Sequence, residues 1–131
     1  MTPRNPTDVA QVNVDALTEP NSIYFDFDSY QVTYQDANVL LQQFADFLTN
    51  HPQQEVLIQG NADALGSGEY NLALGARRAN EVARLLLGMG VTASQIKTVS
   101  FGKEHATGRD EASRAKDRRA DLLYIKSGQS S

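Results

Sequence analysis

The sequence has 131 residues, the length of one ordinary domain, and 40% of them are apolar, enough for a single hydrophobic core. The net charge is −4 with acidic and basic residues interspersed, which argues against a nucleic-acid binder, because phosphate contacts need a concentrated basic surface. The absence of cysteine excludes disulfides, thiolate metal sites and a cysteine nucleophile. No stretch approaches the roughly 18 consecutive apolar residues of a membrane span.

The composition divides the chain into three segments. Residues 1–21 are polar and contain three prolines, so we expect a flexible leader or tether there. This segment lacks the apolar core of a signal peptide, so we expect any export signal or membrane anchor to lie outside this sequence. Residues 22–126 are expected to form one folded domain, and residues 127–131 form a polar tail.

The first half of the domain shows three elements. Ser22–Phe27 alternates apolar with polar residues and is rich in aromatic side chains, which predicts a strand. Tyr34–Asn50 carries apolar residues at steps of three and four, which predicts a helix that ends at His51–Pro52. The wholly apolar run Val56–Ile58 predicts a short strand that is covered on both faces.

A glycine-rich loop and a long helix follow. Gly60–Gly68 contains three glycines and is expected to be a loop. Glu69–Leu87 is expected to be a helix that Gly88 and Gly90 end. The stripe of this helix expected to face the core consists of Leu72, Ala76, Ala79, Val82, Ala83 and Leu86.

The last third of the domain predicts two more strands around a short helix. The strands are Ile96–Phe101 and Ala120–Ile125, and the helix begins with Asp110 as its cap and runs to about Lys116. The resulting order β-α-β-α-β-α-β implies a layer of helices packed against one sheet.

Catalytic and metal-binding motifs are missing from the sequence. Its two histidines, His51 and His105, do not stand at metal-ligand spacing, and no nucleophile–base pair is evident. Asp26–Asp28 begins like a calcium loop, but Tyr30 and Gln31 break the required pattern. We therefore expect no catalytic residues, no metal and no cofactor.

One pair of charges remains as a candidate binding site. Asp63 lies in the glycine-rich loop, and Arg78 follows fifteen positions later in the long helix. Asn71, Leu74 and Arg78 share a helix face distinct from the expected core stripe, so Arg78 is expected on the rim. An anion and a cation on one rim suit a zwitterion, with an ammonium on Asp63 and a carboxylate on Arg78. An ordinary Asp63–Arg78 salt bridge, or two unrelated surface charges, explains the same pattern.

The stretch GNADALGSGEYNLALGARRAN, Gly60 to Asn80, strongly resembles the OmpA-like peptidoglycan-binding domain, and within it the branch of peptidoglycan-associated lipoproteins. The resemblance covers about Ser22 to Ile125. It implies an α+β fold of the OmpA C-terminal type, in which a mixed four-stranded sheet packs on helices. The other matching stretches are Ile23–Asp28, Val99–Glu104, Asp110–Ala112 and Arg118–Ala120.

The resemblance implies non-covalent binding of peptidoglycan through the meso-diaminopimelate of its stem peptide. Such binding anchors the outer membrane, or an envelope complex, to the cell wall from the periplasm. Asp63 is implied to face the ammonium of that residue and Arg78 its carboxylate. The resemblance leaves a TolB-like or other envelope protein open as a further partner. The remaining residues implied to form the site are Phe27, Asp28, Asn71, Leu74 and Arg118.

Two residues depart from the family pattern near the site. Asp117 stands where the family usually has Asn, and we expect it to hold Arg118 away from the ligand or to lower its net pull. Leu65 replaces an Arg. These departures support an alternative, an OmpA-like protein-interaction module of the cell envelope with weakened or lost peptidoglycan binding. A cell-wall hydrolase is disfavoured because no nucleophile–base pair is present.

Overall fold

The structure is a computed structural model that describes residues 21–33 and 35–125. The expected leader, apart from Asn21, and the expected polar tail lie outside the described residues. Their flexibility, and the domain boundaries that depend on it, therefore stay predictions.

Strands and helices alternate along the described chain in the predicted order. The short helix begins after Asp110, whose side chain accepts a hydrogen bond from the backbone N–H of Ser113, as predicted for its cap. A single turn of 3-10 helix, η1, was not predicted. The elements are β1 (Ser22–Tyr24), α2 (Gln35–Asn50), β2 (Glu55–Asn61), α3 (Gly68–Gly88), η1 (Ala93–Gln95), β3 (Ile96–Gly102), α4 (Glu111–Asp117) and β4 (Arg119–Ile125).

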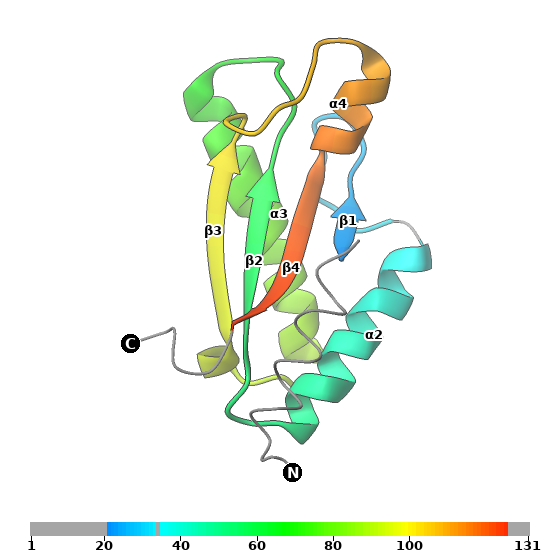
Figure 1. Cartoon of the computed structure of the whole chain (residues 1–131), viewed down its shortest axis with the longest axis vertical. Helices are drawn as coiled ribbons and strands as arrows, with labels where there is room; N and C mark the ends of the chain where they lie inside the picture. Colours follow the sequence, from blue (N-terminus) through cyan, green and yellow to red (C-terminus); the bar gives the residue numbers. More distant parts are fainter. Residues whose placement is uncertain (1–20, 34, 126–131) are drawn as a thin grey trace.

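The strands form one mixed sheet in the order β1-β4-β2-β3. β4 runs antiparallel to β1 and to β2, whereas β2 and β3 are parallel, which confirms the mixed sheet. Parallel strands finish at the same edge of a sheet. Figure 1 shows α4 and the loop that leads into α3 at this end of the molecule. The loops that follow β2 and β3 therefore meet there.

The hydrophobic core lies on the side of the sheet where α2 and α3 pack (Figure 1). Along β2 the burial alternates: Val56 and Ile58 are fully buried in the core, whereas Leu57 is half-buried on the other face. The expected coverage of both faces of this strand is therefore wrong, since the described helices α2 and α3 cover one face. Helix α2 contributes Phe44, which stacks on Tyr124 of β4 at 4.7 Å between ring centroids.

Helix α3 buries a different face from the one expected. Leu72, placed in the core by its periodicity, is half exposed at 50%. Leu74 is buried, and two polar residues expected on the rim, Asn71 and Arg78, are buried as well. Ala79, Val82 and Leu86 are buried as predicted.

The close crossing of α3 over β2 depends on two glycines. A Cβ atom on Gly60 would lie 1.8 Å from the carbonyl oxygen of Gly75, and one on Gly75 would lie 2.4 Å from Oγ of Ser100. Only residues without a side chain permit this approach. Asp63 follows Gly60 by three residues and Arg78 follows Gly75 by three, so this close crossing brings the segments that carry the two charged residues near each other.

Within the described residues, no helix has the length and apolar character that crossing a membrane requires.

Candidate ligand-binding site

A pocket of about 240 Å³ opens at the end of the sheet where β2 finishes. Three segments enclose it: the loop after β1, the loop between β2 and α3, and the first half of α3. Six of the seven predicted site residues line it, and Arg118 does not. Phe27 is 62% exposed and stands at the mouth. The residues that line the pocket are Phe27, Asp28, Asp63, Leu65, Gly66, Tyr70, Asn71, Leu74 and Arg78.

Arg78 is fully buried, which corrects the expected rim position. Its Nε donates to the carbonyl oxygen of Ser29 at 2.8 Å, Nη1 to that of Asn61 at 2.9 Å, and Nη2 to that of Asp26 at 3.2 Å. These carbonyls replace water around the guanidinium, and this is why a charged side chain can be buried here. Burial lowers the pKa of Arg78 to about 10, opposed by the charge of Asp63, so Arg78 stays protonated at neutral pH.

The three carbonyl contacts make Arg78 a clamp on the walls of the pocket. Two of them come from the turn after β1, where Ser29 N donates to Asp26 O at 3.2 Å. Within this turn Asp28 has a φ of 55°, the left-handed conformation that only a few non-glycine residues adopt. Of the five N–H groups of a guanidinium, two on Arg78 have no acceptor among the described residues. Arg78 therefore shapes the pocket, and it contributes to the pocket lining although its side chain is fully buried.

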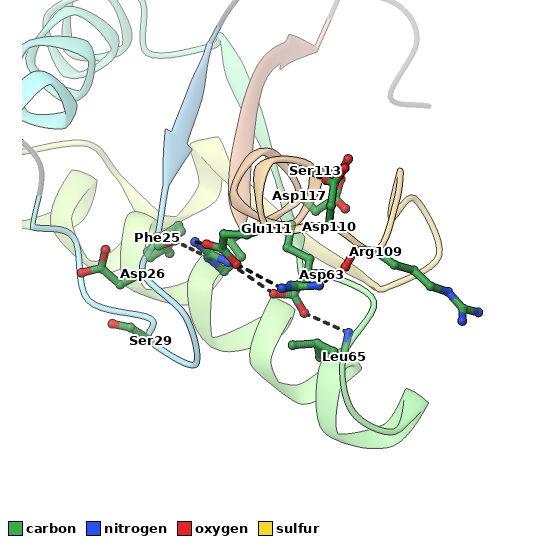
Figure 2. Close-up of polar contacts among 12 residues, drawn as sticks. Phe25, Asp26, Ser29, Asp63, Leu65, Arg109, Asp110, Glu111, Ser113 and Asp117 are labelled. Carbon is green, nitrogen blue, oxygen red and sulfur yellow. Dashed lines mark hydrogen bonds and ion pairs between the residues drawn. The ribbon is translucent and has the colours of Figure 1, made fainter.

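Asp63 is 5% exposed and uses its two oxygens differently. Oδ1 accepts a hydrogen bond from the backbone N–H of Leu65 at 3.0 Å, a contact drawn in Figure 2. Oδ2 lies 3.6 Å from Nη1 of Arg118 and accepts no hydrogen bond from any described residue. Within the described part of the chain, Asp63 thus pairs with Arg118 and not with Arg78, so the expected ordinary Asp63–Arg78 salt bridge is absent.

Arg118 lies behind Asp63, at the junction of α4 and β4. Its Nε donates to the carbonyl oxygen of Phe25 at 3.0 Å, and its Nη2 donates to Oε2 of Glu111 at 3.1 Å. Since Arg118 is only 8% exposed and does not line the pocket, it acts on the site through Asp63. Glu111 was not predicted as a site residue, although a spacing of seven residues places it two helical turns before Arg118.

Two side chains hold the loop between β2 and α3 in place. Nδ2 of Asn71 donates to the carbonyl oxygen of Leu65, and Nζ of Lys103 donates to that of Gly66 at 2.7 Å. Asn71 therefore supports the wall of the pocket, while Leu74 gives it an apolar surface. Lys103 was also missed, because nothing in the sequence shows that the loop after β3 reaches the loop after β2.

Asp117 does not hold Arg118, contrary to expectation. Its side chain is 1% exposed, and both oxygens accept hydrogen bonds from Thr107, one from the backbone N–H and one from the hydroxyl, each at 2.9 Å. Nη1 of Arg119 lies 4.0 Å away. Asp117 thus stabilises the loop between β3 and α4, whereas Arg118 contacts Glu111 and Asp63.

The arrangement of these residues suits binding rather than catalysis. Asp63 and Arg78 line the same pocket; within the described residues, one carboxylate oxygen of Asp63 accepts no hydrogen bond and two N–H groups of Arg78 have no acceptor. The described residues contain no group of three or more His, Cys, Asp or Glu side chains that could hold a metal ion.

Known proteins resemble this chain over most of its length. The model of the OmpA family matches residues 24–120. The peptidoglycan-associated lipoprotein of Haemophilus influenzae is 44% identical over 106 residues, covering 79% of this chain and 69% of that protein. The protein of that name from Pasteurella multocida is 43% identical, covering 79% and 70%.

Solved structures agree with this likeness. The crystal structure of the peptidoglycan-associated lipoprotein from Burkholderia pseudomallei is 52% identical, with a TM-score of 0.76, and the match covers 83% of this chain and 98% of that one. The C-terminal domain of MotB from Helicobacter pylori shares the fold at 20% identity, with a TM-score of 0.71 and coverage of 82% and 85%. The three lipoproteins are named for their association with peptidoglycan, and neither they nor MotB carry the name of an enzyme.

Proposed function

Because the chain belongs to the OmpA family, we propose that it binds peptidoglycan non-covalently and links the cell wall to the outer membrane or to an envelope complex. The names of relatives that are 43% to 52% identical support this role. The domain then works in the periplasm of a Gram-negative-type envelope, and membrane attachment runs through a part of the protein outside the described residues.

The ligand group in this proposal is the free end of meso-diaminopimelate in the stem peptide, which carries both an ammonium and a carboxylate. One observation carries the proposal: Asp63 and Arg78 line one pocket, and among the described residues one oxygen of Asp63 accepts no hydrogen bond and two N–H groups of Arg78 have no acceptor. Asp63 takes the ammonium and Arg78 the carboxylate. The pocket, at about 240 Å³, is smaller than the roughly 300–1,000 Å³ of drug-sized sites, so it suits the end of one side chain.

The affinity of such a site is modest. Two or three charge-assisted hydrogen bonds contribute roughly 1.5–3 kcal/mol each, and ordering costs offset much of this, which leaves a dissociation constant of roughly micromolar or weaker. That affinity suffices, since peptidoglycan is a polymer that presents the group many times, and a membrane tether raises the effective concentration.

Co-sedimentation with diaminopimelate-type sacculi tests the site through Asp63→Asn. The amide keeps an oxygen for the N–H of Leu65 but loses the charge, so the loop is retained and the ammonium loses its partner. We expect binding to fall at least about tenfold, the effect of one charge-assisted hydrogen bond. Glu104→Gln removes an exposed charge from a neighbouring loop and is expected to bind like the wild type. Undiminished binding by Asp63→Asn contradicts the assignment of the site.

Lysine-type sacculi test the zwitterion, because lysine offers the ammonium without the carboxylate. We expect clearly weaker binding to them than to diaminopimelate-type sacculi. Equal binding to both types of sacculus would contradict the assignment of Arg78 as the partner of the carboxylate.

The alternative function is an OmpA-like protein-interaction module with weakened or lost peptidoglycan binding. The exposed Leu65 at the mouth of the pocket, where the resembling family has an Arg, favours it. A folded wild-type protein that binds neither type of sacculus would support this alternative. A TolB-like or other envelope protein is the partner to assay by pull-down in that case.

A further inference from the structure

Arg118 is a buried cation that lies between two acids of very different exposure. The side chain of Asp63 is 6% exposed and that of Glu111 is 67% exposed. Nη2 of Arg118 donates to Glu111 at 3.1 Å, whereas Nη1 lies 3.6 Å from Asp63 and has no hydrogen-bond partner among the described residues. Glu111 belongs to α4, and Figure 2 labels both acids.

The unpaired Nη1 is unusual because buried donors nearly always have a partner. This nitrogen is enclosed, so a ligand in the pocket does not reach it. The nearest acceptor is Oδ2 of Asp63, and a shift of less than 1 Å would bring the two atoms to the roughly 2.7–3.2 Å of a hydrogen bond. The other hydrogen bonds of Arg118 therefore explain why its Nη1 stays short of Asp63.

Two anchors hold Arg118 at this distance. One is the carbonyl oxygen of Phe25, which is part of the backbone next to β1. The other is Glu111, whose second oxygen lies 3.4 Å from Nη2 of Arg114. Glu111 is thus held between Arg114 and Arg118, and neither Glu111 nor Arg118 lines the pocket. Asp117 cannot replace it, because both oxygens of Asp117 bind Thr107.

We propose that Glu111 is a positioning residue: it holds Arg118 within ion-pair distance of Asp63 but short of a hydrogen bond, and so keeps one oxygen of Asp63 available to the ammonium group of the ligand. Without Glu111, Arg118 closes on Asp63, and the ligand must compete with a buried, hydrogen-bonded cation. This inference rests on the proposed function, because it takes the ligand group at Asp63 to be an ammonium.

The first test needs no ligand and uses a crystal structure of the Glu111→Ala variant. Glu111 is largely exposed, so the substitution is expected to leave the fold intact. We expect the distance between Nη1 of Arg118 and Oδ2 of Asp63 to fall from 3.6 Å to hydrogen-bonding distance. Glu111→Gln keeps an oxygen that accepts from Nη2, so the longer distance is expected to persist. A distance of 3.6 Å or more in Glu111→Ala overturns the inference.

The second test is a double-mutant cycle on ligand affinity, measured by calorimetry with a soluble disaccharide tripeptide that ends in meso-diaminopimelate. Glu111→Ala is expected to weaken binding on the order of tenfold. The same substitution in an Arg118→Gln background is expected to have no effect, because the competing cation is gone. Glu104→Ala, which removes an exposed acid from the neighbouring loop, is the matched control and is expected to bind normally.

The outcomes separate this inference from the proposed function. An equal loss in both backgrounds, or tighter binding by Glu111→Ala, overturns the positioning role while the function stands. A wild-type protein that does not bind the muropeptide overturns the proposed function and the ammonium part of the inference. The crystallographic distance still decides, in that case, whether Glu111 controls the position of Arg118.

Discussion

The substitution Arg78→Ala is expected to destabilise the domain as well as its binding site. Arg78 is fully buried and donates to the carbonyl oxygens of Asp26, Ser29 and Asn61. Removing it leaves three backbone oxygens without these donors and opens a cavity beside the core. Two of the oxygens belong to the turn after β1, but Asn61 is the last residue of β2, so the damage extends into the sheet.

The size of the loss follows from these contacts. Each hydrogen bond that involves a charged group contributes roughly 1.5–3 kcal/mol. Three of them give a loss of at least about 4.5 kcal/mol in the free energy of unfolding, which overlaps the roughly 3–5 kcal/mol that removing one partner of a buried ion pair costs. This is a large fraction of the roughly 5–15 kcal/mol that stabilises an ordinary domain.

Urea unfolding followed by circular dichroism measures this loss, and the neighbouring residue supplies the control. Arg77 is exposed, and its guanidinium lies 5.9 Å from the ring of Tyr30. We expect Arg77→Ala to cost no more than about 1 kcal/mol, the contribution of an exposed cation–π contact. If Arg78→Ala and Arg77→Ala unfold within about 0.5 kcal/mol of each other, the reasoning about the clamp is refuted.

Three further predictions concern the rest of the domain. Gly60→Ala is expected to cost more than about 2 kcal/mol in urea unfolding, because its Cβ would meet the carbonyl oxygen of Gly75 at 1.8 Å; an unchanged stability contradicts this. Tyr124→Phe is expected to leave stability unchanged or to raise it by about 1 kcal/mol, because it removes a buried hydroxyl that has no hydrogen-bond partner among the described residues. The same burial raises the pKa of this hydroxyl. A clear loss of stability would contradict the absence of a partner. A hydrogen bond from the backbone N–H of Ser113 holds the pKa of Asp110 below its usual value of 3.8. The ionised Asp110 therefore stabilises α4 fully above pH 3.8, and this stabilisation is lost as the pH falls through the lower pKa of the folded state. Cα chemical shifts of α4 in an acid titration measure this, and shifts that do not change contradict it.

The arrangement of elements could be predicted from the sequence because local signals and tertiary structure agree there. Asp110 caps α4, as predicted from its short acidic side chain at the start of the helix. The alternation of strands and helices along the chain likewise predicts the layered fold. Strand β1 ends at Tyr24 and is shorter than predicted, although the alternating pattern continues to Phe27. The left-handed Asp28 lies in the turn that follows Phe25 and Asp26.

The burial of α3 could not be predicted from periodicity. Helical patterns rank residues by hydrophobicity, which places Leu72 in the core and Arg78 on the rim. Arg78 is buried because carbonyl groups from the turn after β1 and from the end of β2, both distant in sequence, accept its hydrogen bonds, and no local pattern encodes their presence. The residues of the pocket were brought together as predicted, but their role in ligand binding stays a prediction. Glu111 and Lys103 were missed because they act on other site residues rather than on the pocket itself.

The clamp of Arg78 also affects how other sequences with this fold should be compared. A descendant of this chain that no longer binds the cell wall can replace Asp63 at little structural cost, because among the described residues only one backbone N–H and one ion pair depend on it. It cannot replace Arg78 as easily, because the turn after β1 and the end of β2 both depend on that side chain. An arginine at this position is therefore expected to persist after binding is lost, and the acid at position 63 is the better marker for distinguishing wall binders from domains that keep only the fold.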